Sequence, residues 1–220
     1  MKILLKNRIK FIIVFLIVII ASCNQNNSTN LKEKTVAILP YKGISQLEID
    51  TISKTLQSFY KIKTIQLPFQ EISKKAFVNI KSPRFRADSI IKLQQKLKPS
   101  SVNYILGLTN KDISVTKKDK QGNIKKPTYK YNDFGVMGLA YCPGKSAIVS
   151  TFRLKSSNKK LQLERFKKVV IHEFGHNLGL PHCDNKHCVM TSAAEKITTI
   201  DSEKMELCEK CKTKINYEEK

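Results

Sequence analysis

The sequence predicts an α/β fold, with a twisted mixed β-sheet, a backing helix and a second helix that holds the chemically active side chains. Strand and helix patterns alternate over residues 35–109, which is typical of a sheet covered by helices. A long helical pattern follows at residues 160–178 and contains two of the four histidines. Four cysteines after residue 182 then predict a small, cross-linked C-terminal subdomain.

The first half of the chain supplies three strands and two helices. Residues 35–40 are apolar and β-branched and end at a proline, which indicates a strand. Residues 44–60 place apolar side chains at helical spacing, and residues 62–67 form a second short strand. Residues 87–97 predict the backing helix. Residues 102–109 are mostly apolar, so we expect this strand to be buried on both faces.

The second half supplies the edge of the sheet and the active helix. Residues 114–132 are rich in lysine and predict an exposed hairpin or loop. Residues 133–141 predict an edge strand that ends in a turn at Cys142, and residues 147–152 pair back with it. Residues 160–178 predict a helix whose buried stripe consists of Phe166, Val169, Val170, Phe174 and Leu178.

Residues 1–23 predict an export leader rather than part of the fold. Four basic residues precede an uninterrupted apolar run over residues 11–21, which is short for a membrane span. The run ends in Ile-Ala-Ser-Cys, which resembles a bacterial lipobox with Cys23 as the lipid acceptor. A short uncleaved anchor helix is the alternative. Both interpretations place the protein in the cell envelope, outside the cytoplasm and beside a membrane, with residues 24–34 as a flexible tether.

The length and net charge of the chain limit the number of domains and the partners that we expect. The remaining chain suits one domain, divided into residues 35–182 and a C-terminal subdomain at 183–220, and we expect a monomer. The formal net charge is +22, but the excess is dispersed lysine rather than arginine clusters with interleaved aromatics. Because an exported protein rarely meets nucleic acid, we expect no nucleic-acid partner.

The segment 172–182, HEFGHNLGLPH, has the pattern of a catalytic zinc site. His172 and His176 are four residues apart and share one helical face, so both imidazoles can reach one ion. Glu173 lies beside them, where it can hold a water molecule. Gly179 can adopt a positive φ and end the helix, and the following turn returns His182 as the third ligand. Three imidazoles leave the fourth position open, as in catalytic zinc sites.

The four late cysteines predict a second cross-link. The spacing of Cys183, Cys188, Cys208 and Cys211 suits a tetrahedral all-thiolate zinc site. Two disulfides are the alternative, because an oxidising compartment would permit them. Either cross-link ties the His182 loop to the C-terminal helix. The remaining His187 is expected to be exposed and idle.

The complete string H-E-x-x-H-x-x-G-x3-C-x4-C-x-M-x17-C-x-x-C resembles that of the archaemetzincins, a branch of the metzincin metalloproteases. The resemblance extends upstream over roughly residues 35–212. It implies a metzincin-like metalloprotease fold with one catalytic and one structural zinc ion. It also implies that Met190 forms the Met-turn beneath the catalytic zinc, and that a peptide lies antiparallel to the edge strand at 134–141.

These observations predict a lipid-anchored zinc peptidase in which Glu173 acts as general base on the attacking water. The alternative is a non-catalytic, zinc-stabilised, lipid-anchored envelope protein that keeps the motif for folding or binding. A purely structural zinc site does not need a general base, so the presence of Glu173 favours the peptidase.

Overall fold

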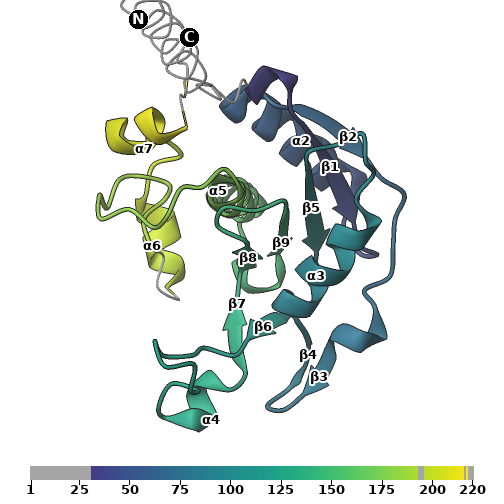
Figure 1. The fold of residues 1–220 in the computed structure, drawn as a ribbon, viewed down its shortest axis with the longest axis vertical. Coiled ribbons are helices and arrows are strands. Elements are labelled where there is room, and N and C mark those ends of the chain that lie inside the picture. Colours follow the sequence, from purple (N-terminus) through teal and green to yellow (C-terminus); the bar gives the residue numbers. More distant parts are fainter. Residues whose placement is uncertain (1–30, 193–195, 216, 218–220) are drawn as a thin grey trace, which may run out of the picture.

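The computed structural model describes residues 31–192, 196–215 and 217, and within them the main sheet has five strands in the order β2-β1-β5-β9-β8 (Figure 1). The strands β2, β1, β5 and β9 are parallel, and the edge strand β8 is antiparallel to β9. The bounds are β1 (Thr35–Pro40), β2 (Lys63–Gln66), β5 (Tyr104–Thr109), β8 (Gly138–Ala140) and β9 (Ser146–Ser150). The predicted mixed α/β sheet is therefore confirmed.

Helices cover both faces of this sheet because the side chains of its strands alternate in direction. In β1, Val36 and Ile38 pack into the core beneath α2 and α5, whereas Ala37 and Leu39 pack against α3 on the other face. All four side chains are buried, as expected for a strand that is apolar on both faces. The helices are α2 (Gln46–Tyr60), α3 (Ala87–Leu97) and α5 (Lys159–Asn177).

A second sheet of four strands, β3-β4-β6-β7, lies beside the main sheet in the described part of the chain and was not predicted. Its strands are β3 (Phe77–Asn79), β4 (Pro83–Arg86), β6 (Ile113–Val115) and β7 (Phe134–Val136). They are short, and their burial patterns are mostly partial, so they lack the long alternating or apolar runs by which a strand is recognised.

The prediction of a single edge strand at residues 133–141 is wrong, because the two halves of this segment pair with different sheets. Its first part, β7, pairs with β6 of the second sheet, and its second part, β8, pairs with β9 of the main sheet. Between them the carbonyl oxygen of Met137 accepts a hydrogen bond of 2.8 Å from the Ser150 amide. One segment thus joins the two sheets. The Lys-rich segment before it contains the expected hairpin, bridged between Lys118 and Ile124, and one unpredicted helical turn, α4 (Thr128–Tyr131).

Buried ion pairs hold the second sheet against the main one. Asp112 accepts hydrogen bonds from Arg153 Nε at 2.8 Å and Nη2 at 2.9 Å, and it also pairs with Arg84. Asp133 lies between Arg84 and Arg86, 3.6 Å from each. Arg84, Arg86, Asp112 and Asp133 are largely excluded from solvent and depend on one another for charge compensation, whereas Arg153 is exposed.

The C-terminal segment packs on the side of α5 that lies away from β1 and β2 (Figure 1). It contains α6 (Ile197–Ser202) and α7 (Glu209–Lys214). At the other end, Leu31 belongs to a short 3₁₀ turn, η1 (Leu31–Glu33), and packs against the core. The predicted leader, with Cys23, lies outside the described residues, and no helix among the described ones has the length and apolar character needed to span a membrane.

Candidate metal centre

The helix α5 presents His172 and His176 together at the edge of a cleft. Their Nε2 atoms lie 3.1 Å apart, and their rings are nearly perpendicular. The helix begins at Lys159 behind an Asn158 cap and continues to Asn177, close to the predicted bounds. The buried side of the helix contains four of the five predicted stripe residues, Phe166, Val169, Val170 and Phe174, whereas Leu178 is only partly buried.

Backbone carbonyl groups orient both helical imidazoles. The carbonyl oxygen of Val189 lies 2.8 Å from His172 Nδ1, and that of Leu180 lies 2.6 Å from His176 Nδ1. A carbonyl oxygen can only accept, so each Nδ1 bears the proton and donates it. Each Nε2 is therefore left with a lone pair, which is the form in which imidazole binds a metal.

A tight turn after α5 brings the third histidine to the same place. Gly179 adopts the left-handed conformation, with φ of +94°, and its amide donates to the His176 carbonyl. The Leu180 amide donates to the Gly175 carbonyl, and Leu180 is fully buried. The turn thus ends the helix as predicted and leaves His182 exposed towards the cleft.

The three imidazoles fit a zinc ion. One nitrogen from each of His172, His176 and His182 lies within 4.8 Å of the other two. A tetrahedral ion with Zn–N distances of about 2.0–2.1 Å requires nitrogen atoms about 3.4 Å apart, close to the separation of the two helical Nε2 atoms. Burial lowers the pKa of His172 to about 3 and also lowers the pKa of His176 and His182. The site therefore keeps its imidazoles neutral, as ligation requires.

Glu173 is buried beside this triad, in space left by Gly138, a residue that the sequence pattern did not single out. Burial raises the pKa of Glu173 to about 8. A Cβ atom at Gly138, at the start of β8, would lie only 2.5 Å from Glu173 Cγ and 2.7 Å from its Oε1. The strand backbone thus passes directly over the carboxyl group. The only sequence signal is the glycine itself within an otherwise apolar strand.

Met190 packs beneath the triad, where the resemblance places the Met-turn. Its side chain is fully buried, and a Cβ atom at Gly175 would lie 2.5 Å from its Sδ atom. The same Cβ would lie 2.9 Å from the hydroxyl oxygen of Tyr60, which donates to the Ile171 carbonyl. Gly175, a variable position of the motif between the two helical histidines, therefore lets Met190 and Tyr60 approach the helix backbone.

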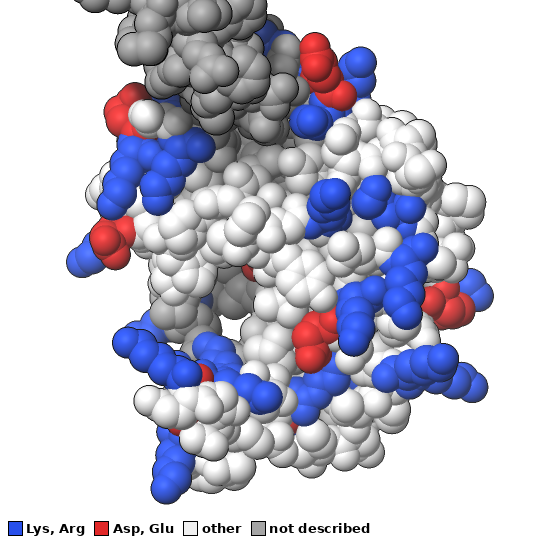
Figure 2. All heavy atoms as spheres, in the orientation of Figure 1, with Lys and Arg blue, Asp and Glu red and all other residues white. Residues whose placement is uncertain are grey.

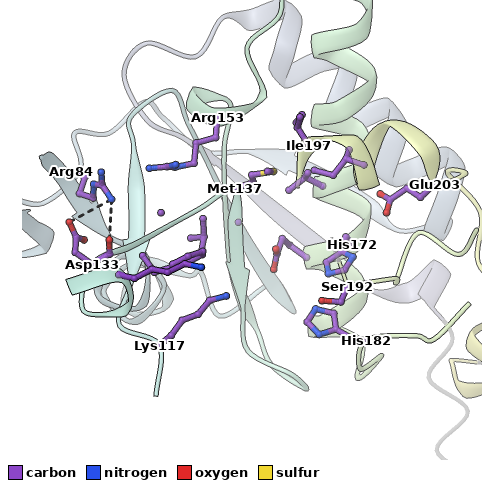
Figure 3. A pocket seen from close by; sticks show the side chains of 18 of the residues that line it. Arg84, Lys117, Asp133, Met137, Arg153, His172, His182, Ser192, Ile197 and Glu203 are labelled. Carbon is purple, nitrogen blue, oxygen red and sulfur yellow. Dashed lines mark hydrogen bonds and ion pairs between the residues drawn. The ribbon is translucent and has the colours of Figure 1, made fainter. Parts of the chain in front are cut away.

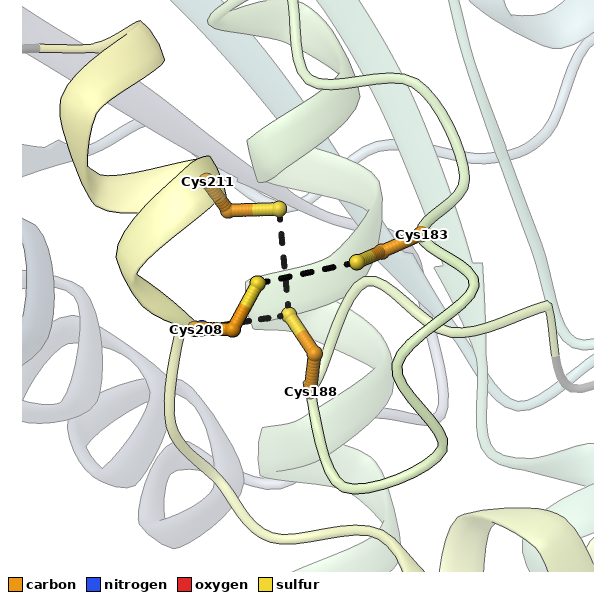
Figure 4. A group of neighbouring side chains, drawn as sticks. All are labelled: Cys183, Cys188, Cys208 and Cys211. Atoms are coloured by element: carbon orange, nitrogen blue, oxygen red, sulfur yellow. Dashed lines mark hydrogen bonds between the residues drawn. The ribbon is translucent and has the colours of Figure 1, made fainter.

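The four predicted cysteines converge on one point (Figure 4). Cys183 Sγ lies 3.6 Å from Cys208 Sγ, Cys188 Sγ lies 3.8 Å from Cys211 Sγ, and all four sulfur atoms lie within 4.8 Å of one another. A disulfide bond requires about 2.05 Å between sulfurs, whereas a tetrahedral zinc–thiolate site places them about 3.8 Å apart. This geometry fits a bound ion, and the structure has these cysteines as free thiols.

The cysteine cluster is connected to the histidine site through a few backbone bonds. The Cys183 amide, directly after His182, donates to the Met190 carbonyl at 2.8 Å. Val189, whose carbonyl oxygen orients His172, lies between Cys188 and Met190. The same short loop therefore supplies thiols to one cluster and a fixed carbonyl to the other.

A cleft of about 720 Å³ opens over the histidines. One wall contains His172, Glu173 and His182 together with residues of α6, and Arg84, Lys117 and Arg153 lie on the opposite side (Figure 3). Its floor follows residues 133–138, which lead into the edge strand β8. A space-filling view shows lysine and arginine side chains around the lower rim of the opening (Figure 2).

Two further residues singled out from the sequence are neither histidine-site nor cysteine-cluster ligands. His187 is exposed, as expected, and its amide donates to Asn185. Cys142 is exposed and is a free thiol, and its Sγ lies 3.4 Å from the Leu180 carbonyl oxygen that also accepts from His176.

Comparisons with known proteins agree with this geometry. The family model for peptidase family M54 matches residues 60–217. The archaemetzincin of Haloarcula marismortui is 29% identical over 189 residues, which cover 82% of this chain and 98% of that protein. The crystal structure of archaemetzincin from Archaeoglobus fulgidus, complexed with malonate, has a TM-score of 0.65 at 26% identity and covers 82% of this chain and 99% of that one. The archaemetzincin structure from Methanopyrus kandleri has a similar fold, with a TM-score of 0.69 at 22% identity and coverage of 88% and 97%.

The contact between Gly175 and Met190 can be tested by a double-mutant cycle. Alanine is favoured over glycine by about 1 kcal/mol in an exposed helix, but overpacking a core costs about 1–3 kcal/mol. We therefore expect Gly175→Ala to lower the free energy of unfolding, measured in urea, and to speed loss of zinc to a chelator. On a Met190→Ala background the same change should cost much less. Additive effects of the two substitutions would show that the contact does not constrain position 175.

Proposed function

This chain belongs to peptidase family M54 and is a zinc metallopeptidase, and we propose that it cleaves peptide bonds within the cleft with Glu173 as general base. The observation that supports this most directly is the joint placement of the three imidazoles and one buried carboxyl group. The ligand nitrogens of His172, His176 and His182 lie within 4.8 Å of one another, and Glu173 follows His172 in the same wall of the cleft. The rival non-catalytic role is not favoured.

In the proposed mechanism the zinc ion and Glu173 have separate roles. Zinc held by the three histidines would supply a Lewis acid and lower the pKa of a coordinated water toward about 7. Glu173 takes a proton from the attacking water and gives it to the leaving amine as the carbon–nitrogen bond breaks. Burial raises the pKa of Glu173, which strengthens it as a base, while a nearby dication favours its ionised form.

We propose that the substrate binds as an extended strand along the floor of the cleft. The strand β8 is at the edge of the described sheet, and Gly138, its first residue, lies against Glu173. An extended peptide can pair with such an edge through main-chain hydrogen bonds. This places its backbone beside the proposed general base. Because β7 belongs to another sheet, this pairing involves the short edge strand β8 rather than one continuous strand over residues 134–141.

We also propose a second, structural zinc ion held by the four cysteines. The sulfur separations of 3.6 Å and 3.8 Å support four thiolate ligands around one ion. Such an ion would clamp Cys183, next to His182, to α7 and would hold the third histidine in place. The C-terminal subdomain at 183–220 would then act as a brace for the catalytic site.

The proposed cellular setting is a membrane surface outside the cytoplasm. The basic residues, the apolar run and the lipobox-like end at Cys23 support export as a bacterial lipoprotein. Lipid chains contribute about 0.8 kcal/mol for each buried methylene group, so several acyl chains would anchor the enzyme.

The first prediction concerns Glu173. Glu173→Gln should retain zinc at the histidine site but lower the rate of peptide hydrolysis by about 10²–10⁴-fold, because the amide cannot take up a proton. The rate and the zinc content by elemental analysis are measured together. Glu164→Gln, at a more exposed position on the same helix, is the control. If Glu173→Gln hydrolyses the peptide as fast as the parent enzyme, Glu173 is not the general base and the proposed mechanism is wrong.

The second prediction concerns the cysteine cluster. Cys211→Ser should lower the zinc content from about two ions to about one or fewer per chain and should impair hydrolysis, because His182 loses its brace. Glu164→Gln, which lies outside both clusters, should change neither quantity. Thiol counting under non-reducing denaturation completes the measurement. One zinc per active chain, with the four sulfurs present as two disulfides, would replace the proposed ion with a covalent clamp.

The third prediction concerns anchoring. Cys23→Ala should move the protein from the membrane pellet to the soluble fraction or leave it as an unprocessed precursor, because no acyl group can be attached. Mass spectrometry of the native protein should find acyl chains on an N-terminal Cys23. An unmodified N-terminus together with an unchanged pellet would argue for the uncleaved anchor helix.

A further inference from the structure

One carboxyl group in the wall of the cleft has no role in the proposed reaction. Glu203 lines the same cleft as His172 and Glu173, yet it is only 4% exposed. Its Oε2 atom is buried and accepts no hydrogen bond from any described residue. Burying a carboxyl oxygen without a hydrogen-bond partner costs free energy. The Glu203 carboxyl group can therefore still accept a hydrogen bond from a cationic group.

The other two carboxyl groups of the described cleft lining lie next to charged residues or the histidine site. Asp133 lies between Arg84 and Arg86, and Glu173 lies beside the histidine triad. The opposite wall and rim are basic, with Lys81, Arg84, Lys117, Lys130 and Arg153. A positively charged group that enters the cleft is therefore repelled by this basic wall, and the ionised form of Glu203 is the carboxylate left in the lining with which it can pair.

The surroundings of Glu203 hold it in position. It follows α6, which Arg165 clamps to α5 through two hydrogen bonds of 2.7 Å to Asp201. Lys168 Nζ donates to the carbonyl oxygens of Ile200, at 2.7 Å, and of Glu203 itself. Lys168 thus fixes the backbone of Glu203, but no ion pair is found between Lys168 and its carboxyl group in the described part of the chain. The carboxyl group points towards the interior of the cleft (Figure 3).

The contact of Glu203 with α5 indicates where it lies relative to the proposed zinc site. Val169, which lines the cleft near α6, precedes His172 by three residues, and one helical turn is about 5.4 Å long. Lys168, which contacts Glu203, precedes His172 by four residues, so Glu203 lies beside the part of α5 about one turn before this proposed zinc ligand. Its remaining lining includes Ile197 and Ile200. Apolar walls with a carboxyl group suit a group that has an aliphatic stem and a cationic tip.

We propose that Glu203 forms a specificity subsite for a positively charged substrate group next to the scissile bond, with a lysine or arginine side chain as its occupant. This inference rests on the proposed peptidase function and adds its substrate class. Burial raises the pKa of Glu203 to about 8 against the opposing effect of Lys168, so a cation bound beside it would favour the ionised carboxylate. A free N-terminal amine offers the same charge, and the test below separates it from a side chain.

The test uses the zinc-loaded enzyme and peptides in which one residue is scanned along the chain as lysine or as its uncharged analogue norleucine. Every peptide is made with a free and with an acetylated N-terminus. We expect kcat/KM for the best lysine peptide to exceed that of its norleucine partner by about tenfold or more, and Glu203→Gln to bring this ratio close to one. Glu71→Gln, an exposed carboxyl group paired with Lys42 outside the cleft, should leave the ratio unchanged.

The ratio is internal to each enzyme preparation, so a partly folded variant lowers both rates without changing it. A lysine preference that survives acetylation assigns the subsite to a side chain, and a preference that requires the free amine assigns it to the substrate N-terminus. Equal cleavage of lysine and norleucine peptides by the parent enzyme, or a ratio unchanged by Glu203→Gln, overturns the proposal while leaving the peptidase function intact. Failure to cleave any peptide would overturn the proposed function itself.

Discussion

Two backbone carbonyl oxygens, those of Val189 and Leu180, orient the helical imidazoles, and much of the C-terminal structure is needed to place them. Helical spacing brings His172 and His176 to one face, but it does not set their ring orientation or tautomer. The Leu180 carbonyl is placed by the turn at Gly179. The Val189 carbonyl is placed by its neighbours Cys188 and Met190, both buried. The metal site therefore depends on chain segments that do not touch the ion.

This dependence explains why the two clusters of potential ligands lie so close together. Ten residues, from Cys183 to Ser192, hold two of the cysteines, the buried methionine and the carbonyl that orients His172. The Cys183 amide and the Met190 carbonyl close this loop with one hydrogen bond. A loop of this length has too few apolar side chains to hold its own shape, so a cross-link through four sulfurs is an economical way to fix it.

The sequence was sufficient for the parts of the structure that local patterns determine. The helices at 87–97 and 160–178 and the central strands follow from periodicity. The convergence of the three histidines and of the four cysteines follows from motif spacing, which reports distances along one helix or one short loop. The second sheet, the break at Met137 and the approach of Gly138 to Glu173 were missed. Each depends on contacts between segments far apart in the chain. The burial of Glu203 likewise depends on how α6 docks on α5, which no local pattern records.

The edge strand β8 has a consequence for solubility. A strand with unpaired backbone groups is a template on which other chains can aggregate, and proteins usually cover or interrupt such edges. Here the edge has only three residues, and the chain leaves it at Met137 to join another sheet. The cleft walls rise on either side of it. A strand of three residues offers few unpaired backbone groups, so another sheet could pair with it only over a short length. The same shortness that limits how long a guest strand can pair with β8 thus also limits the length over which this edge could join two copies of the protein.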